Sequence, residues 1–101
     1  MHIVNIMFAR GGGGIEQAFV DYCKCLTQRG HQITAIIYPG AVVQEQLRQL
    51  SIPVLTMRNF SEWDFFASFR LRKLLHKLKP DIVIAHANRA YVIANRANAD
   101  L

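Results

Sequence analysis

Two short polar stretches of this sequence carry the residue types that bind anions and transfer protons. They are Arg10-Gly11-Gly12-Gly13-Gly14 and His86-Ala87-Asn88-Arg89. Four consecutive glycines remove every Cβ from the first stretch, so a ligand can approach the main-chain N–H groups closely. The histidine of the second can donate a hydrogen bond or act as an acid or base near neutral pH. The two stretches together predict a polar crevice that suits a phosphate or diphosphate. The alternative for the glycines is a flexible connector that requires positive φ angles.

The glycine stretch lies between a predicted strand and a predicted helix. Residues 2–8 are apolar and rich in large or β-branched side chains, which is typical of a buried strand. After the glycines, apolar residues recur at helical spacing at Ile15, Ala18, Phe19, Tyr22, Cys23 and Leu26. Gly30 then provides a helix stop, because glycine adopts the left-handed conformation at little cost. Unpaired N–H groups and the positive end of the helix dipole therefore point at Gly12, Gly13 and Gly14, where an anion is expected.

Strands and helices alternate along the rest of the chain. Further strands are predicted at residues 33–38, 53–57 and 81–86, and further helices at 41–50, 62–79 and 89–100. Continuously apolar strands that alternate with helices predict a parallel sheet with helices on both faces. Right-handed crossovers give the strand order 3-2-1-4. We therefore expect an α/β, Rossmann-like fold in which the carboxyl ends of the first and fourth strands share one crevice.

The glycine stretch does not match two common nucleotide-binding motifs. The dinucleotide fingerprint fails because Glu16 or Gln17 stands where its last glycine is required, and no acidic residue follows the second predicted strand. A P-loop fails because no Gly-Lys-Ser/Thr sequence follows the glycines. No metal site is predicted either, because the other histidines lack the spacing of metal ligands. These are His2, His31 and His76.

Four side chains near the crevice each have a functional and a structural interpretation. Glu16 either caps its helix or orients a hydroxyl group or a water molecule. Arg10 and Arg89 either clamp a phosphate or only interact with solvent at a helix start. His86 is either the acid, base or hydrogen-bond donor of the site, or a strand-end histidine whose hydrogen bonds are satisfied within the fold.

The net charge is +5, and five of the twelve cations lie within residues 70–79. They belong to the predicted helix at 62–79, for which Asn59 and Ser61 offer caps. Its leucines, Leu71, Leu74, Leu75 and Leu78, share one face. The cations for which we expect a partner are Arg70, Arg72, Lys73 and Lys77. These cations form either a solvated face or a contact with anionic lipid headgroups. The lipid contact is favoured by the preceding aromatic residues, Trp63, Phe65, Phe66 and Phe69, because aromatic side chains favour the membrane interface. Those aromatic residues equally suit the core or a substrate site. No nucleic-acid partner is predicted, because no recognition motif accompanies the charge.

The sequence suggests a cytoplasmic chain. No apolar run approaches the ~20 residues of a membrane span, and residues 2–8 begin a strand without the features of a signal peptide. Cys23 and Cys25 point to different sides of their helix, so they cannot pair with each other or share a metal. We therefore expect two reduced thiols and, as an extension of the charge argument, peripheral contact with the inner face of the membrane.

Three segments resemble elements of the family 4 glycosyltransferases. Gly13-Gly14-Ile15-Glu16-Gln17 is similar to the G-G-[IV]-E element that follows the family's first strand. Residues 26–34 (LTQRGHQIT) resemble its R-G-H-x-V-T passage from helix to strand. Residues 79–87 (KPDIVIAHA) resemble its K-P-D-V-V-H-x-H strand. The three matches occur in the family's order and spacing.

The resemblance implies a GT-B fold, in which two Rossmann-like domains face each other across a cleft. This chain would be an incomplete N-terminal, acceptor-side domain, and the C-terminal domain would hold a nucleotide-diphosphate sugar. The implied reaction transfers a hexose to a glycan or lipid-linked acceptor, as in polysaccharide or lipopolysaccharide biosynthesis, without a metal or any cofactor beyond the donor. The amide of Gly14 would approach the diphosphate or the acceptor, and His86 would lie near the reacting sugar.

The chain also departs from the family pattern. It has four glycines where many relatives have two, and Arg10 precedes them. The family's donor-binding pair of glutamates belongs to a C-terminal domain that 101 residues do not contain. We therefore expect residues 1–101 to be a partial domain that is inactive alone. The alternative is a non-catalytic module that binds a nucleotide or phosphate, or a partner subunit.

Overall fold

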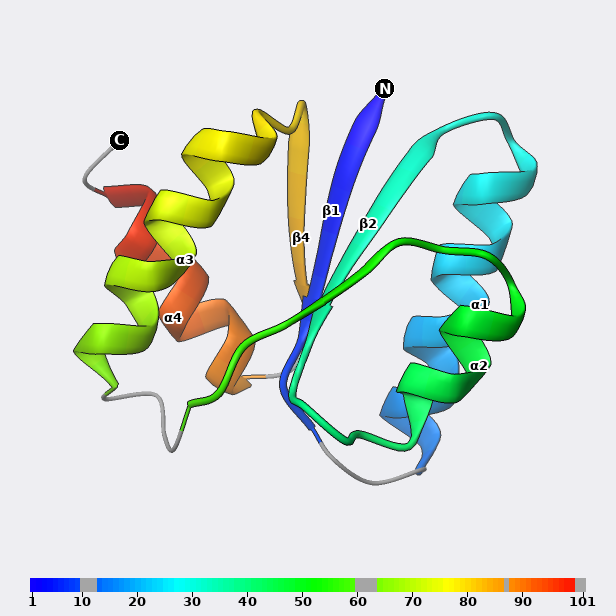
Figure 1. The fold of residues 1–101 in the computed structure, drawn as a ribbon, viewed down its shortest axis with the longest axis horizontal. Coiled ribbons are helices and arrows are strands. Elements are labelled where there is room, and N and C mark those ends of the chain that lie inside the picture. The colour runs from blue at the N-terminus through cyan, green and yellow to red at the C-terminus, as the bar shows by residue number, and fades with distance from the viewer. Residues whose placement is uncertain (10–12, 60–63, 87, 100–101) are drawn as a thin grey trace.

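The computed structural model describes residues 1–9, 13–59, 64–86 and 88–99 of the chain. These residues form a four-stranded parallel sheet and four helices (Figure 1). The strands are β1 (His2–Met7), β2 (Gln32–Ile37), β3 (Val54–Thr56) and β4 (Ile82–His86). The helices are α1 (Gly14–Gln28), α2 (Val43–Gln49), α3 (Phe65–Leu78) and α4 (Asn88–Ala99). The sheet order is β3-β2-β1-β4, so the predicted fold class and strand order are confirmed.

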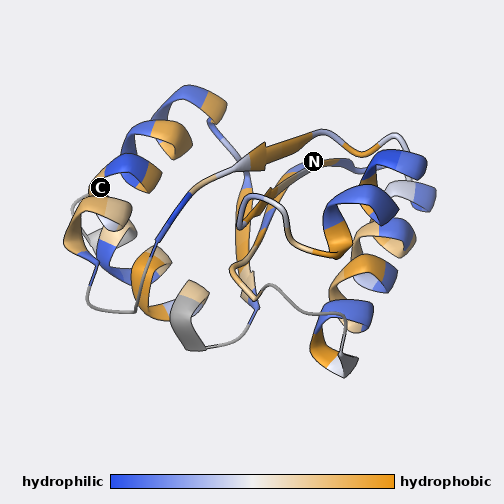
Figure 2. Cartoon of the chain, turned by 60° about the horizontal axis from the view of Figure 1, so that its bottom comes forward, coloured by the Kyte–Doolittle hydropathy of each residue, from blue (hydrophilic) through white to orange (hydrophobic). Residues whose placement is uncertain are grey.

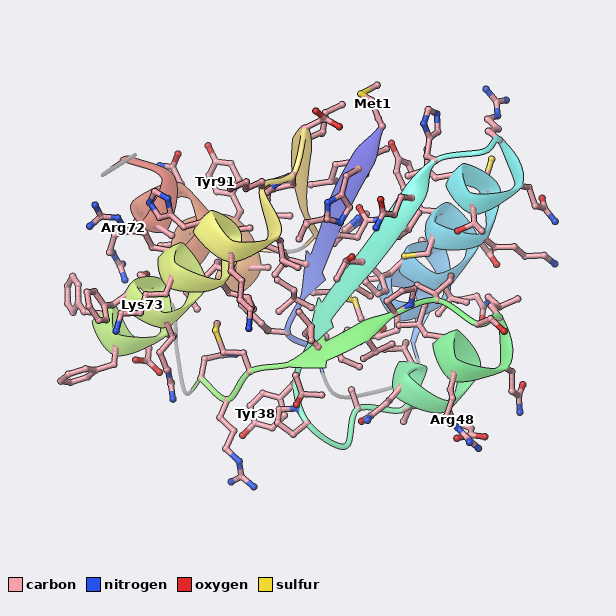
Figure 3. All side chains as sticks on the ribbon, turned by 45° about the horizontal axis from the view of Figure 1, so that its top comes forward. Met1, Tyr38, Arg48, Arg72, Lys73 and Tyr91 are labelled. Atoms are coloured by element: carbon pink, nitrogen blue, oxygen red, sulfur yellow. The ribbon has the colours of Figure 1, made fainter. Side chains whose placement is uncertain are left out.

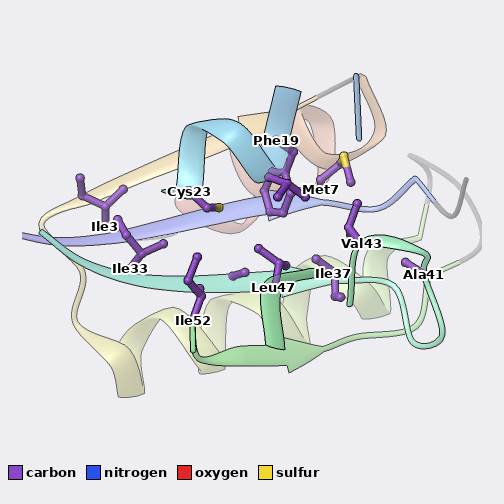
Figure 4. Packing of buried hydrophobic residues seen from close by; sticks show 12 residues of the cluster. Ile3, Met7, Phe19, Cys23, Ile33, Ile37, Ala41, Val43, Leu47 and Ile52 are labelled. Carbon is purple, nitrogen blue, oxygen red and sulfur yellow. The ribbon is translucent and has the colours of Figure 1, made fainter. Parts of the chain in front are cut away.

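The helices form two layers, with α1 and α2 on one face of the sheet and α3 and α4 on the other (Figure 1). Each layer closes its own apolar core, since alternate residues of β1 point to opposite faces. Met7 packs with Phe19 and Leu47 on the α1/α2 side (Figure 4). Ile6 packs with Leu71 and Ile93 on the α3/α4 side. The helices accordingly show hydrophobic strips beside hydrophilic ones in Figure 2.

The register of the sheet brings the ends of three strands to one level. Met7, the last residue of β1, pairs with Ile37 of β2 on one side and with His86 of β4 on the other. Parallel pairing places all their carboxyl ends at the same edge. This carboxyl edge is where ligands bind in open α/β sheets, next to the strand at which the chain order reverses.

Helix α1 buries a narrower stripe than its sequence pattern predicted. Phe19 and Cys23 are fully buried, but Ile15 and Tyr22 are 58% and 46% exposed. Val20, which the helical pattern did not include, is buried. The sheet and α2 therefore cover only one side of the predicted stripe. The left-handed conformation expected at Gly30 is confirmed, with φ at 89°.

Helix α3 begins later than predicted and has a different cap. The carboxylate of Asp64 accepts a hydrogen bond from the N–H of Ala67 at 2.9 Å, which is the usual N-cap interaction. Asn59 was wrongly assigned as a cap: its side chain is buried and donates to the carbonyl of Met57. The other candidate, Ser61, lies outside the described residues, as does Trp63.

The inward leucine face of α3 is confirmed. Leu71 and Leu75 are buried, and Leu74 and Leu78 pack against the same core. Within the described ranges, no helix has the length and apolar character needed to cross a membrane.

Candidate functional site

The fold brings the predicted histidine and the end of the glycine stretch to the same edge of the sheet. His86 is the last residue of β4, and Gly13 is the N-cap of α1, which follows β1. β1 and β4 are neighbours, and their carboxyl ends are level at Met7 and His86. If His86 and Gly13 lay at opposite ends of the sheet, they could not contribute to one crevice.

The ring of His86 packs against α1 below the start of that helix. It makes edge-to-face contacts with Phe19 and Tyr22, at centroid distances of 5.0 and 5.6 Å. Phe19 follows Gly14 by five residues, which corresponds to about 7.5 Å along a helix axis. The imidazole therefore lies about one and a half turns below the first N–H groups of α1.

Asn5 contacts both His86 and Cys23, and no sequence pattern predicted this. It lies in the middle of β1 with no exposed surface. Its Nδ2 donates to Sγ of Cys23 at 3.3 Å, and its Oδ1 lies 3.5 Å from Nε2 of His86. The available signal was a single amide within the apolar run HIVNIMF, where a buried polar side chain requires partners.

These contacts define the protonation of the histidine. An amide oxygen can only accept a hydrogen bond, so a bond across the 3.5 Å between Asn5 Oδ1 and Nε2 of His86 requires the tautomer with its proton on Nε2. Burial lowers the pKa of His86 from its ordinary value near 6.5. The ring is therefore neutral at pH 7, and its Nδ1 retains the lone pair that can accept a proton or a hydrogen bond.

The two cysteines have opposite environments, as expected. Both are free; Cys23 is buried and Cys25 is exposed. Burial raises the pKa of Cys23 to about 11, although the hydrogen bond from Asn5 acts in the other direction. Cys23 is therefore a protonated structural thiol whose sulfur orients the Asn5 amide.

The glycines at the start of α1 are not required by the fold itself. The φ angle of Gly13 is −78°, and Gly14 is the first helical residue, so neither needs a left-handed conformation. A Cβ added to Gly14 would meet nothing within 4 Å. A Cβ on Gly13 would lie 3.1 Å from Oε2 of Glu16, whose carboxylate therefore sits beside the first turn. The bare backbone at Gly14 faces open space.

The remaining predicted site residues are only partly placed. Arg89 lies in the first turn of α4, at the carboxyl edge, but its side chain is not among those described. Arg10 and Gly12 lie outside the described residues. In the described ranges, no cluster of three or more histidine, cysteine or acidic side chains could hold a metal.

The aromatic residues of α3 do not belong to the core. Phe65, Phe66 and Phe69 are 62%, 79% and 54% exposed. Cations lie over two of these rings, with Lys73 Nζ 4.7 Å from the centroid of Phe69 and Arg96 Cζ 4.3 Å from that of Phe65. This surface of α3 is therefore available to a ligand or to a second surface.

Several solved structures share the fold of this chain. A glycosyltransferase from Rickettsia africae matches 99% of the chain with a TM-score of 0.81 and 20% identity, over 27% of its own length. HepE of Anabaena in complex with UDP matches 99% with a TM-score of 0.77 and 20% identity, over 27% of its length. MurG of Acinetobacter baumannii matches 97% with a TM-score of 0.73 and 20% identity, over 32% of its length. The chain has the fold of part of a GT-B half-domain.

The sequence comparisons identify the family. Residues 12–100 match Glycosyltransferase Family 4, and the chain belongs to that family. It is 30% identical over 91 residues to the lipopolysaccharide core biosynthesis glycosyltransferases LpsD and LpsE of Rhizobium meliloti. These matches cover 89% of this chain but 26% of each relative, so the chain spans about a quarter of their length.

Proposed function

We propose that this chain is the N-terminal, acceptor-side part of a glycosyltransferase of hexosyl type. The enzyme would transfer a sugar from a nucleotide-diphosphate sugar to a glycan or lipid-linked acceptor. Family membership supports the reaction class. The names of LpsD and LpsE support an acceptor of the lipopolysaccharide type. The UDP bound in HepE supports a nucleotide-linked donor.

The observation that carries the proposal is the bare start of α1 beside the tip of β4. The fold gives no internal reason for glycine at Gly14, where a Cβ would meet open space. Glycine there is useful only if something approaches the backbone closely. The first N–H groups of a helix and its dipole favour a diphosphate or a negatively charged acceptor group. His86 lies at the same edge of the sheet and contacts Phe19 of α1.

In this proposal each predicted side chain has one role. Gly12, Gly13 and Gly14 present N–H groups to a diphosphate, and Arg10 and Arg89 neutralise its charge. Glu16 orients an acceptor hydroxyl. During transfer, the bond between the anomeric carbon and the diphosphate oxygen breaks, and the nucleoside diphosphate leaves with the electron pair. The acceptor oxygen bonds to that carbon, and Nδ1 of His86 receives the hydroxyl proton.

We further propose that a C-terminal domain beyond residues 1–101 supplies the rest of the donor site, so this chain alone does not catalyse transfer. The chain's coverage of 26% of its relatives supports this division. The outer edge of β4 supports it too. Among the described residues β4 pairs only with β1, and its Ile82 and Val83 are 39% and 38% exposed. Further strands or a neighbouring domain would cover this apolar edge.

The cationic surface of α3 suggests that the enzyme works in the cytoplasm, in peripheral contact with the inner face of the membrane. Arg70, Lys73 and Lys77 are exposed, and Arg72 is partly exposed. Such a surface attracts anionic lipid headgroups by about 1 kcal/mol per cation. The test is sedimentation with vesicles of phosphatidylglycerol or phosphatidylcholine. Selective binding to the anionic vesicles, reduced in a Lys73→Gln/Lys77→Gln variant, is expected; equal binding to both lipids would contradict this part of the proposal.

The main experiment is an NMR titration of the chain with UDP- and GDP-sugars. The amides of residues 13–16 and the ring of His86 should shift, while those of the remote Gly30 and Gly40 should not. Unchanged signals at residues 13–16 would refute the proposed site. Inorganic pyrophosphate is the comparison ligand. If it binds as tightly as any nucleotide-sugar, the site recognises phosphate alone, which would favour the alternative of a non-catalytic phosphate-binding module.

A further inference from the structure

A second hollow lies at the carboxyl edge, on the face of the sheet opposite to His86. It has a volume of about 470 Å³ and lies where the chain leaves β2 and β3 and enters α3. Its lining residues are Tyr38, Arg58, Asn59, Asp64, Phe66, Phe69 and Arg70. Tyr38 is visible at the ends of the strands in Figure 3. Because neighbouring strands are about 4.8 Å apart, β2 and β3 lie roughly 10–15 Å from β4, so this hollow is separate from the His86 site.

One residue of the lining, Asn59, carries an unsatisfied buried atom. Asn59 is only 4% exposed, and its Nδ2 donates to the carbonyl of Met57 at 3.4 Å. Its Oδ1 is buried and accepts no hydrogen bond within the described part of the chain. Such an atom costs about 1–3 kcal/mol unless a partner is supplied. A hydroxyl group of a ligand would supply that partner.

The aromatic residues of the hollow provide flat apolar surfaces next to this polar atom. Phe66 and Phe69 project from the first turns of α3 and are mostly exposed. Binding sites for small molecules typically combine aromatic walls with a few polar groups that fix orientation. A sugar ring has this same character, since it presents C–H groups on its faces and hydroxyl groups around its rim.

Two guanidinium groups give the hollow a positive charge. Arg70 Nη2 donates to the carbonyl of Arg58 at 2.9 Å, which holds the Arg70 side chain against the segment after β3 and uses one of its five N–H donors. Lys73 and Lys77 line an adjoining hollow that also contains Arg70. Among the described residues of the lining Asp64 is the one carboxylate, and its Oδ1 already accepts from the N–H of Ala67. Within this described part of the lining, cations therefore outnumber anions.

From this combination we infer that the hollow binds an anionic sugar unit, one that bears a phosphate or a carboxylate. The aromatic side chains contact the ring, Asn59 Oδ1 accepts from a hydroxyl group, and Arg58 and Arg70 pair with the anionic group. The assignment of this sugar to the acceptor rests on the proposed function. The binding of an anionic sugar to the hollow does not depend on that function. An acceptor held here and extending along the carboxyl edge would present its next hydroxyl group toward the His86 crevice.

The test is titration of the 101-residue chain with glucose 6-phosphate, glucuronate, glucose and inorganic phosphate, followed by NMR. The two anionic sugars should shift the side-chain amide of Asn59 and the Nε signal of Arg70. They should bind about tenfold or more tightly than glucose, which lacks the charge-assisted hydrogen bonds. They should also bind more tightly than inorganic phosphate, which lacks the ring.

Substitutions of two exposed side chains test the contacts with the sugar and leave the core packing intact. Arg58→Gln should weaken both anionic sugars about tenfold. Phe66→Ala should weaken them while leaving inorganic phosphate unchanged. Arg48→Gln is the matched control, because Arg48 lies on α2, paired with Glu45 and away from α3 (Figure 3), and should have no effect. Circular dichroism establishes that each variant is folded.

Three results would overturn the inference. Glucose could bind as tightly as glucuronate, or inorganic phosphate could bind as tightly as glucose 6-phosphate. The third result is that neither substitution weakens the binding of the anionic sugars. The source of the anion is tested with phosphatidylglycerol vesicles. If Arg58→Gln and Phe66→Ala lower vesicle binding as much as sugar binding, the hollow is a lipid-headgroup site. The outcome is independent of the nucleotide-sugar titration, because that experiment monitors residues 13–16 and this one monitors Asn59 and Arg70.

Discussion

Oδ1 of Asn5 lies 3.5 Å from Nε2 of His86, although the two residues are 81 positions apart in the sequence. The contact crosses from β1 to β4 and places an acceptor opposite one nitrogen of the imidazole. The other side of the same amide is held by Cys23. Three residues from two strands and a helix thus determine which nitrogen of His86 carries a proton.

Asn5→Asp should raise the pKa of His86. The substitution places a carboxylate where an amide oxygen now accepts, and an opposite charge at that distance stabilises the imidazolium. The measurement is an NMR titration of the His86 ring. Asn5→Leu is the control, because it removes the acceptor without adding charge and should leave the pKa low or lower it further. An unchanged pKa in folded Asn5→Asp would show that the two side chains do not interact.

The free energy of unfolding should fall as the pH is lowered from about 7. Burial lowers the pKa of folded His86 below its ordinary value of 6.5, so the unfolded chain binds a proton at a pH where the folded chain does not. Stability therefore decreases as the pH falls through 6.5 and levels off below the folded-state pKa. Urea unfolding of the wild type and His86→Gln between pH 5 and 8 tests this. Parallel curves for the two proteins would contradict it.

Gly14→Ala and Gly30→Ala should have opposite effects. Gly30 has a φ of 89°, so alanine there costs about 1 kcal/mol or more. Gly14 is helical and faces open space, so alanine should leave stability unchanged or raise it by about 0.4–1 kcal/mol. The same Gly14→Ala change should weaken nucleotide-sugar binding about tenfold under the proposed function. Thermal unfolding and the NMR titration measure the two effects, and unweakened binding by Gly14→Ala would argue against close approach at this glycine.

A thiol reagent should modify Cys25 alone in the native chain. Cys25 is exposed, whereas burial protects Cys23 and raises its pKa to about 11. Ellman's reagent at pH 8 should therefore detect one thiol in the folded protein and two after denaturation. Cys25→Ser should abolish the native reaction, and Cys23→Ser should preserve it. Rapid labelling of Cys23 under native conditions would show that α1 does not cover it.

The local pattern of the sequence was sufficient for the arrangement of strands and helices. Apolar runs and helical periodicity depend on residues a few positions apart, and right-handed crossovers then define the strand order. The same reasoning placed Gly14 and His86 at one edge, because parallel strands end on the same side of a sheet. It failed at the N-cap of α3, where Asp64 was overlooked in favour of Asn59. Both residue types suit a cap, and only the packing decides which is free to serve.

The amino-acid sequence by itself therefore determined the α/β fold, the family and the shared edge of the sheet at which Gly14 and His86 lie. Tertiary structure alone decided that Asn5 would meet His86 and Cys23, and that Asn59 would be buried with an unpaired oxygen beside Phe66. These contacts depend on side-chain packing between elements that are distant in the chain. No periodicity within one element encodes that packing.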